Sequence, residues 1–514
     1  MDKHYAKQVL YQNATILTFN ESDECLEHGD LLICGDQIKD IGHVEPTENM
    51  EVIDCSHHLI MPGLVNAHLH SDENMFKGRF DNMPLELWML YSCPPSEYGP
   101  LSRRLIYLKT MIGAIEMVKS GVTAAQDDVA EYPIMTAEGC DPVFEAYEDI
   151  GMRANVGFNN NNRHYCDKLP YAWEMIPKEL QRKLPPPVTG DYLLDVYRQV
   201  IRKWNGRSDL KVTLSVSAPQ RCSDDYLQKM EKLSQQENLP YHMHILETKT
   251  QRVTGYEFYN ETLIEHANRL GLLSPRLTIP HAIWVEDKDI QVMGEHGVNV
   301  VHNIVSNLKL GSGIMPIEKM KEAGVHIALG SDGMSSNDGQ KIFEVMKFCG
   351  LIHKVTQPDY RRWITSDEVL EYAIQGGARS MLREKEIGSL SVGKKADFIV
   401  LDMDSTAFVP LNNIKNHLVY CENGNSVERV VIRGQSVVVD HELQTVDEKA
   451  IIHEIQAVTE EFQRNYRKTE AVNDQLYPYV DSIYRRCMQE PDFIWRFTDH
   501  EAPIRWNEEG VVCR

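Results

Sequence analysis

The chain has 514 residues, a formal net charge of −23 at neutral pH, 42% hydrophobic residues and 25% charged residues. This length exceeds a single compact domain, and the composition is that of an ordinary globular protein. The acidic balance argues against nucleic acid and anionic membrane surfaces as partners. No apolar run is long enough to predict a membrane span, and residues 1–17 lack the apolar stretch of a signal peptide.

The cysteines indicate the redox environment. Eleven of them are scattered from Cys25 to Cys513, without a CxxC pair. An odd and dispersed set in a long chain is typical of reduced thiols. We therefore expect a cytoplasmic protein.

The two ends of the chain predict one small β domain. Residues 1–61 and 391–445 contain short β-rich runs separated by polar and Gly-containing turns. We expect these pieces to form a β-sandwich together. Residues 446–514 begin with a helical pattern and continue with many aromatic and arginine residues. This extension either packs on its own barrel or contacts another subunit, and the second interpretation predicts a homo-oligomer.

The middle of the chain, residues 62–390, alternates predicted strands with amphipathic helical segments. The eight strand candidates are GLVNAHLH, GVTAAQDD, RANVGF, KVTLSVSAP, PYHMHILE, LTIPHAI, NVVHNI and HIALGSD. Eight such units predict a (β/α)8 TIM barrel. An open doubly wound sheet would usually carry a Gly-rich loop after its first strand. Two long loops, 71–100 and 159–195, stand outside the repeat, and each is either a lid over the site or a solvated surface loop.

Metal-ligand residues stand at the ends of the predicted strands. His68 and His70 are two residues apart, so their side chains share one face of a strand. His244, His281 and Asp332 end three other apolar runs. Because a barrel collects its strand ends at one mouth, these side chains predict a divalent-metal site. Zinc suits such ligands best, and iron or manganese would also fit.

Some of these residues have a second interpretation. His242 shares a strand face with His244, and we assign it to a deeper position in the barrel because His244 lies nearer the strand end. Asp332 alone would be read as a helix cap or turn residue. His302 is either a substrate contact or a structural residue. Glu247, three residues after His244, is placed to fold back over the metal.

The chain resembles the amidohydrolase superfamily, in the branch of cytosine, guanine and S-adenosylhomocysteine deaminases and chlorotriazine hydrolases. The matching motifs are PGLVNAHLH, GVTAAQD, HILE, HNIVSNLKLGSG, LGSDGMSSN and IGSLSVGKKADFIVL. The resemblance implies one divalent metal ion held by His68, His70, His244 and Asp332. It also implies that Glu247 transfers protons and that His281 orients water or polarises the substrate. Related enzymes with two metals use a lysine on strand four, where the only lysine here, Lys211, stands at the wrong end.

This resemblance implies a metal-dependent hydrolytic deaminase of an aminated nitrogen heterocycle, of the pyrimidine, purine, pterin or triazine type. A metal ion makes hydroxide available near neutral pH, and the hydroxide attacks the amine-bearing carbon with release of ammonia. Glu247, His281 and Asp332 would be catalytic. The alternative is hydrolysis of another C–N bond, in a cyclic amide or N-alkylamine, or of a C–halogen bond. A scaffold without catalysis would have lost a ligand or Glu247, and none is missing.

The substrate signatures of two subgroups are absent. The Pro-His-x-Pro-Tyr motif of nucleoside-handling relatives is replaced by residues 218–222, APQRC, and the guanine-deaminase motif after the first histidines is replaced by residues 71–74, SDEN. These departures favour another aminated heterocycle over adenosine-type and guanine substrates. The candidate substrate contacts are Glu73, Asn74, Trp88, Gln220 and His302.

Overall fold

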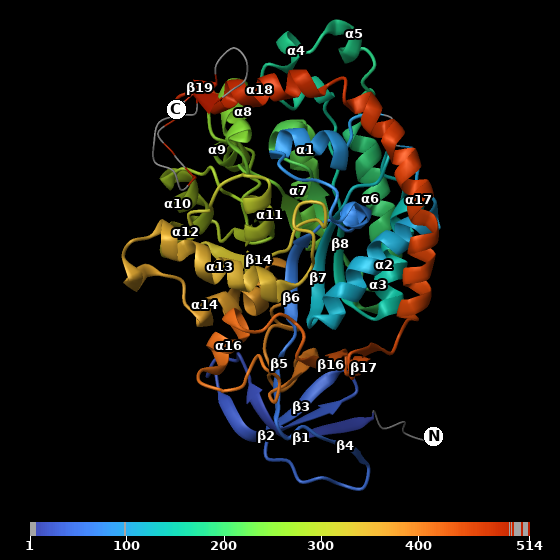
Figure 1. The fold of residues 1–514 in the computed structure, drawn as a ribbon, viewed down its shortest axis with the longest axis vertical. Helices are drawn as coiled ribbons and strands as arrows, with labels where there is room; N and C mark the ends of the chain where they lie inside the picture. Colours follow the sequence, from blue (N-terminus) through green and yellow to red (C-terminus); the bar gives the residue numbers. More distant parts are fainter. Residues whose placement is uncertain are drawn as a thin grey trace.

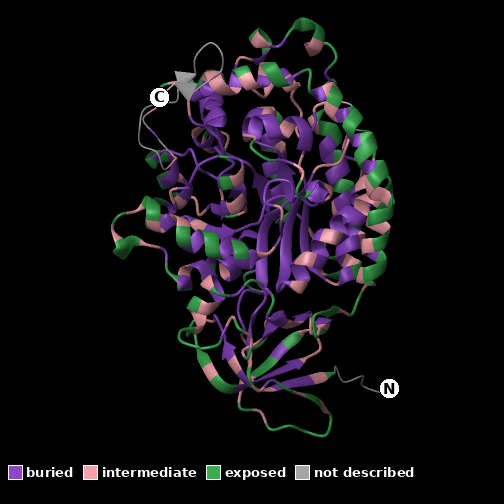
Figure 2. Ribbon diagram, viewed as in Figure 1, coloured by how far each residue is buried: buried purple, intermediate pink, exposed green. Residues whose placement is uncertain are grey.

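A computed structural model describes residues 7–96, 99–492, 494, 496–497, 505–506 and 512–513. Figure 1 shows two units, a barrel wrapped by helices and a small β domain below it. The strands of the barrel are almost wholly buried, whereas its helices expose their outer faces (Figure 2).

The barrel has the eight predicted strands. They are β6 (Leu64–Leu69), β7 (Val122–Val129), β8 (Arg153–Phe158), β9 with β10 (Lys211–Val212 and Leu214–Val216), β11 (Tyr241–Met243), β12 (Leu277–Pro280), β13 (Asn299–His302) and β14 (His326–Leu329). Neighbouring strands pair in parallel. Thr213 interrupts the fourth strand, since its N–H donates to Val156 of β8 while that of Leu214 donates to Pro240 beside β11, on the other side. The prediction of a TIM barrel is confirmed.

Helices cover the outside of this barrel. They are α2 (Arg103–Lys119), α3 (Ala137–Ile150), α6 (Gly190–Trp204), α7 (Asp224–Glu237), α8 (Lys249–Tyr259), α9 (Leu263–Arg269), α10 (Asp287–Glu295), α11 (Ile304–Lys309), α12 (Ile317–Glu322), α13 (Ile342–Thr356), α14 (Ser366–Glu371) and α15 (Gly377–Ser380). Several begin at a Ser or Thr whose side chain accepts a backbone N–H of the first turn, as Ser102, Thr136 and Ser223 do. Helix α6, for example, buries an apolar stripe that includes Leu193, Val196 and Val200 and exposes the opposite face.

The small β domain joins both ends of the chain. Its strands are β1 (Gln8–Leu17), β2 (Cys25–Cys34), β3 (Gln37–Gly42), β4 (Met50–Asp54), β5 (His58–Pro62), β15 (Phe398–Asp402), β16 (Val427–Ile432), β17 (Gln435–Val439) and β18 (Glu442–Leu443), and α16 (Ile414–Tyr420) follows β15. The antiparallel pair β5–β15 unites the two pieces in one curved, sandwich-like sheet. A buried ion pair, Arg153 Nε to Asp397 Oδ2 at 2.6 Å, fastens the sheet to barrel strand β8.

The extension after residue 446 packs on its own barrel. Helix α17 (Glu448–Asn473) runs along the barrel beside α2, and α18 (Tyr477–Gln489) crosses its upper end (Figure 1). Both contact α1 (Leu85–Ser92) of the first long loop. Phe462, Tyr466 and Val480 share an apolar cluster with Phe76 and Trp88 of that loop. The aromatic residues Phe493 and Trp495 lie outside the described residues.

Short elements complete the connections between the strands and helices. They are the 3₁₀ turns Ser71–Phe76, Tyr165–Asp167, Arg207–Asp209, Pro219–Arg221 and Tyr360–Arg362, the π turn Tyr372–Gly376, the short helices α4 (Ala172–Met175) and α5 (Lys178–Gln181), and the strand pair β19 (Arg505–Trp506) and β20 (Val512–Cys513). Across the described residues, every helix is too short or too polar to cross a bilayer.

Candidate metal centre

Four buried histidines and an aspartate from four strand ends meet at the barrel mouth. Nitrogen atoms of His68, His70 and His244 lie within 4.8 Å of one another. Oδ1 of Asp332 lies 3.4 Å from Nε2 of both His68 and His70, and its Oδ2 lies 3.7 Å from Nε2 of His281. The parallel strands therefore bring together residues that are up to 264 positions apart in the sequence.

Each histidine is oriented through the ring nitrogen that faces away from the cluster. Nδ1 of His70 lies 2.5 Å from the carbonyl oxygen of Asp128, and Nδ1 of His244 lies 3.0 Å from that of Ser217. A carbonyl only accepts, so Nδ1 of both rings carries a proton, and Nε2 is the nitrogen that faces the cluster. Nδ1 of His281 lies 2.7 Å from Oδ1 of Asn307. Metal-ligating histidines are held in this way.

His242 lies one layer deeper, where the sequence placed it. Its Nε2 lies 2.9 Å from Nδ1 of His68, and its own Nδ1 lies 2.9 Å from the amide of Gln126. It thus supports a ligand from within the barrel. Nε2 of His68 is left buried without a hydrogen-bond partner and points at Asp332.

The local backbone at Asp332 aims the carboxylate into the cluster. Asp332 has a φ of +64°, its N–H donates to the carbonyl oxygen of His68, and the Gly333 N–H donates to its Oδ1. The first of these bonds also joins β14 to β6 and closes the barrel. A Cβ at Gly333 would lie 1.8 Å from Oε2 of Glu73, so only glycine leaves room for that side chain. Such sparsely populated backbone conformations are typical of functional sites.

The electrostatics of the cluster fit a divalent cation. Burial lowers the pKa of His68 to about 3 and holds that of His244 well below its ordinary value, so both rings are neutral ligands. His70 is buried too, yet the surrounding carboxylates, led by Glu73, raise its pKa to about 10. That excess of negative charge is what a cation would neutralise. Three imidazole nitrogens and one carboxylate make a zinc-type donor set, which His68, His70, His244 and Asp332 could supply.

Two carboxyl groups beside His281 have opposite proton affinities. Oε2 of Glu247 lies 3.7 Å from Nε2 of His281, and its Oε1 accepts a hydrogen bond from Ser312. Burial raises the pKa of Glu247. Asp332 is also buried, but the close imidazole of His68, and after it those of His281 and His70, hold its pKa well below the ordinary value. Glu247 therefore has the higher proton affinity of the two relative to an ordinary carboxyl group, and Asp332 the lower.

A single cavity of about 930 Å³ connects this cluster to the loops. Its walls include Glu73, Trp88 and Gln220, three of the residues expected to contact substrate. Trp88 Nε1 and Gln220 Oε1 are buried there without a protein hydrogen-bond partner. These two polar atoms are available to a bound molecule.

Two of the expected substrate contacts lie elsewhere. Asn74 donates to the carbonyl oxygen of Lys109 and packs against α2, away from the cavity lining. His302 faces α13 and lies 3.0 Å from Nε2 of His353, because the preceding Val301 takes the side of the strand that faces the barrel interior. The structure thus supports the structural interpretation of His302 and places Asn74 in a packing role.

Other residues of the site were not identified from the sequence. Asp128 is the second-last residue of β7 and lies 3.9 Å from Nδ1 of His244, and burial raises its pKa to about 6. Its place at the end of GVTAAQDD was a signal of the kind used for the other strands. Asn307, which orients His281, lies in the motif HNIVSNLKLGSG. Val472, Gln475 and Leu476 of the C-terminal extension also line the cavity, and no sequence pattern indicated this.

A barrel with metal ligands at its strand ends is the architecture of a metal-dependent hydrolase. The profile of the amidohydrolase family matches residues 59–437. The 5′-deoxyadenosine deaminase of Methanosarcina barkeri is 31% identical over 455 residues, which are 88% of this chain and 98% of the relative. The 5-methylthioadenosine/S-adenosylhomocysteine deaminase of Caldanaerobacter subterraneus subsp. tengcongensis is 31% identical over 87% of this chain and 97% of its own. The protein belongs to the amidohydrolase family.

Solved structures share the fold. An adenosine deaminase from Xanthomonas campestris with bound zinc superimposes with a TM-score of 0.77 at 24% identity and covers 90% of this chain and 99% of its own. A zinc complex of atrazine chlorohydrolase from Arthrobacter aurescens gives 0.80 at 21% identity, over 88% of this chain and 100% of its own. These likenesses extend over the β domain and the barrel together.

Proposed function

We propose that this enzyme is a metal-dependent hydrolytic deaminase that replaces the exocyclic amine of a nitrogen heterocycle by oxygen and releases ammonia. The observation that carries this proposal is the pair Glu247 and Asp332. They face one another across His281 in the same cavity, and one has a raised pKa while the other has a lowered pKa. When their surroundings shift the pKa values of two neighbouring carboxyl groups in opposite directions, the group with the higher pKa acts as the acid and the other as the base.

The residues then divide the proton transfers. Glu247, whose pKa burial raises, donates a proton to a ring nitrogen and makes the adjacent amine-bearing carbon electrophilic. Asp332, ionised, accepts the proton of the attacking water. His281, fixed by Asn307, points its Nε2 between both carboxyl groups, where it holds the water or the developing alkoxide. A divalent metal, most suitably zinc, lowers the pKa of the attacking water when it is bound.

The first substrates to test are adenosine derivatives with a modified 5′ end. The curated relatives named above carry such substrates in their names and align with nearly nine-tenths of this chain. Residues 218–222 argue against such substrates, because the motif of nucleoside-handling relatives is absent from this segment. We give more weight to the alignment, since it covers the whole barrel and the segment covers one loop.

We further propose that the protein is cytoplasmic and forms homo-oligomers. The ten cysteines from Cys25 to Cys487 are all free thiols, which is consistent with a reducing compartment. The extension that suggested a subunit contact packs on its own barrel, but α13 exposes Phe348, Leu351 and Val355 on one face. An exposed apolar face of this kind favours contact with a second subunit.

The proposal is tested by ammonia release from the purified, zinc-loaded protein. The panel holds 5′-deoxyadenosine, 5-methylthioadenosine, S-adenosylhomocysteine and adenosine, together with an aminated pyrimidine, a pterin and a triazine. We expect ammonia with at least one of them and none from the Glu247→Gln variant. Stoichiometric zinc without ammonia from any compound would contradict the proposal and favour hydrolysis of another bond.

A further inference from the structure

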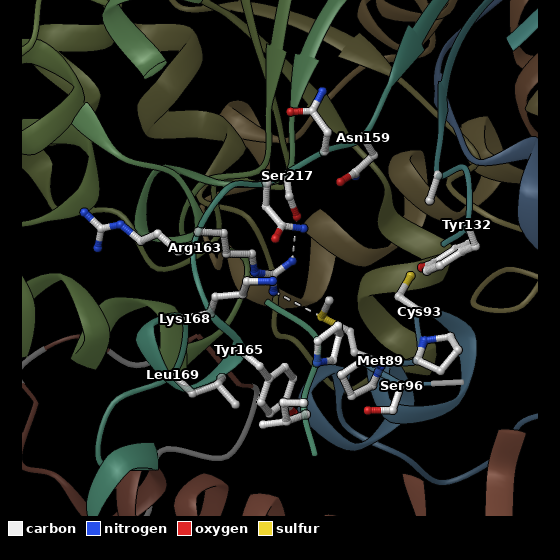
Figure 3. A pocket seen from close by; sticks show the side chains of 18 of the residues that line it. Met89, Cys93, Ser96, Tyr132, Asn159, Arg163, Tyr165, Lys168, Leu169 and Ser217 are labelled. Atoms are coloured by element: carbon white, nitrogen blue, oxygen red, sulfur yellow. Dashed lines mark hydrogen bonds between the residues drawn. The ribbon is translucent and has the colours of Figure 1, made fainter. Parts of the chain in front are cut away.

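Two cationic side chains from different loops face the cavity beside the metal centre. Lys168 directly follows the 3₁₀ turn after β8, and Arg221 ends the 3₁₀ turn after β10. Both line the cavity and both are half-buried. Figure 3 shows Lys168 extending into the pocket near Met89 and Ser217, the two residues that hold Arg221.

Neither cation forms an ion pair with a carboxylate among the described residues. Arg221 donates to Oγ of Ser217 at 2.9 Å and to Sδ of Met89 at 3.1 Å, which are neutral acceptors and leave further N–H groups of the guanidinium unused. No protein acceptor of the Lys168 ammonium occurs in the described parts of the chain. The adjacent Asp167 instead accepts a hydrogen bond from Trp173 at 2.7 Å.

The acidic groups of the same cavity have other partners. Glu86 Oε1 accepts from Thr248 at 2.6 Å, and Glu131 accepts from the backbone and side chain of Thr136. Lys168 and Arg221 are also close enough for the charge of one to disfavour the charged form of the other. Burial, and after it the charge of Arg221, lowers the pKa of Lys168 to about 8. At neutral pH the cavity wall therefore carries two like charges, and no described carboxylate lies within ion-pair distance of either. Burial raises the pKa of Glu86 and of Glu247, and the charge of Arg221 partly opposes that rise.

We propose that Lys168 and Arg221 form a subsite that binds an anionic group of the substrate, a carboxylate or a phosphate. The guanidinium offers paired donors to two oxygens, and the ammonium adds a point charge beside it. This inference rests on the proposed deaminase function and deepens it, because it names a charged substituent on the substrate. A substrate with a neutral 5′ end would leave both cations unpaired.

The subsite lies near the reacting centre. Ser217 joins them, since its hydroxyl accepts from Arg221 while its carbonyl oxygen accepts from Nδ1 of the metal ligand His244. The neighbour Gln220 offers its unpartnered Oε1 to the same cavity. An anion bound at Arg221 would thus fix the orientation of the ring relative to the metal.

The test is the double variant Lys168→Gln/Arg221→Gln, assayed as the zinc-loaded enzyme. The matched control is Lys178→Gln/Arg182→Gln, which removes the same charges from exposed residues of the same loop that do not line the cavity. The substrates are 5′-deoxyadenosine, which has no anionic group, S-adenosylhomocysteine, which has a carboxylate, and adenosine 5′-monophosphate.

We expect the double variant to lose about 10- to 100-fold in kcat/KM for an anionic substrate, mainly through KM. The value for 5′-deoxyadenosine should stay within about 3-fold of the control, a change that corresponds to well under 1 kcal/mol. A loss confined to the monophosphate assigns a phosphate, and a loss confined to S-adenosylhomocysteine assigns a carboxylate. Equal losses for all three substrates, or no loss for either anionic one, would overturn the subsite.

A second measurement separates the subsite from the deaminase proposal. If none of the three compounds is deaminated, the subsite is tested by thermal unfolding with inorganic phosphate against chloride at equal ionic strength. We expect phosphate to raise the Tm of the zinc-loaded wild type and of the control variant, and to raise that of the double variant less. The same shift in all three proteins would overturn the subsite whatever the reaction is.

Discussion

The metal centre and the outer wall of the cavity are built in contrasting ways. Every ligand of the metal centre stands at the end of a barrel strand and is fixed through its second ring nitrogen or the adjacent backbone. The outer wall comes from two long loops and the C-terminal extension, and it contains half-buried cations and unpartnered polar atoms. We therefore expect the barrel to determine the reaction and the wall to determine which substrate is accepted.

The largest effect should come from removing a ligand of the metal centre. We expect His68→Ala to lose its metal and at least about 1000-fold in kcat/KM, because the remaining ligands no longer enclose the ion. Metal content by mass spectrometry and ammonia release check this. Exposed His43 provides the control variant, His43→Ala. A folded His68→Ala protein with full zinc content and activity would show that the ligands are misassigned.

Glu247→Gln should separate catalysis from metal binding. The amide keeps the shape of the side chain but has no proton to transfer, so we expect a loss of about 100- to 10 000-fold in kcat with unchanged zinc content. The control is Glu237→Gln at the exposed end of α7. If the two variants have equal kcat, Glu247 is not the proton donor.

Asn307→Ala tests the support of His281 and should have a smaller effect. The 2.7 Å contact to Nδ1 of His281 orients that ring, and loss of such a partner commonly costs about 10- to 100-fold in activity. Asn425→Ala, an exposed asparagine of the β domain, is the control. An unchanged kcat/KM in Asn307→Ala would mean that packing alone holds His281.

On the outer wall, the pH dependence of KM should report Lys168. Its pKa of about 8 means that the ammonium is charged below that pH and loses its charge above it. Besides Arg221, the nearby groups that titrate or carry charge are Cys222 and Asp167. We expect KM for an anionic substrate to rise several-fold between pH 7 and pH 9, while KM for a neutral one stays flat. Lys168→Gln should abolish the rise, and a rise that persists in this variant would assign the titration to another group.

The smallest effect is expected where the C-terminal extension meets the cavity. Leu476 is buried and lines the cavity, so Leu476→Ala should enlarge it and raise KM by about 3- to 10-fold with little change in kcat. Exposed Leu411→Ala serves as the control. A change in kcat with constant KM would instead connect the extension to the chemistry.

The same contrast explains what could be predicted from the sequence. Side chains alternate between the two faces of a strand, and the strands of a barrel all end at the same mouth. The sequence alone therefore predicts that His68, His70, His244 and Asp332 lie together. His302 also lies at a strand end, but its side chain points out of the barrel toward His353. Its position differs by one residue from one that would face the barrel interior, and the sequence does not show which of the two applies. Arg221 and Leu476 became neighbours of the site only through the folding of loops and of the extension, for which the chain carries no periodic signal.

The most direct test of the central claim is deamination in water enriched in ¹⁸O, with ammonia and product measured together for wild type and Glu247→Gln. The proposed reaction predicts one ammonia per product, with one ¹⁸O atom at the carbon that carried the amine, and almost none of either from the variant. Ammonia released without ¹⁸O in the product, or equal turnover by the two proteins, would contradict the account.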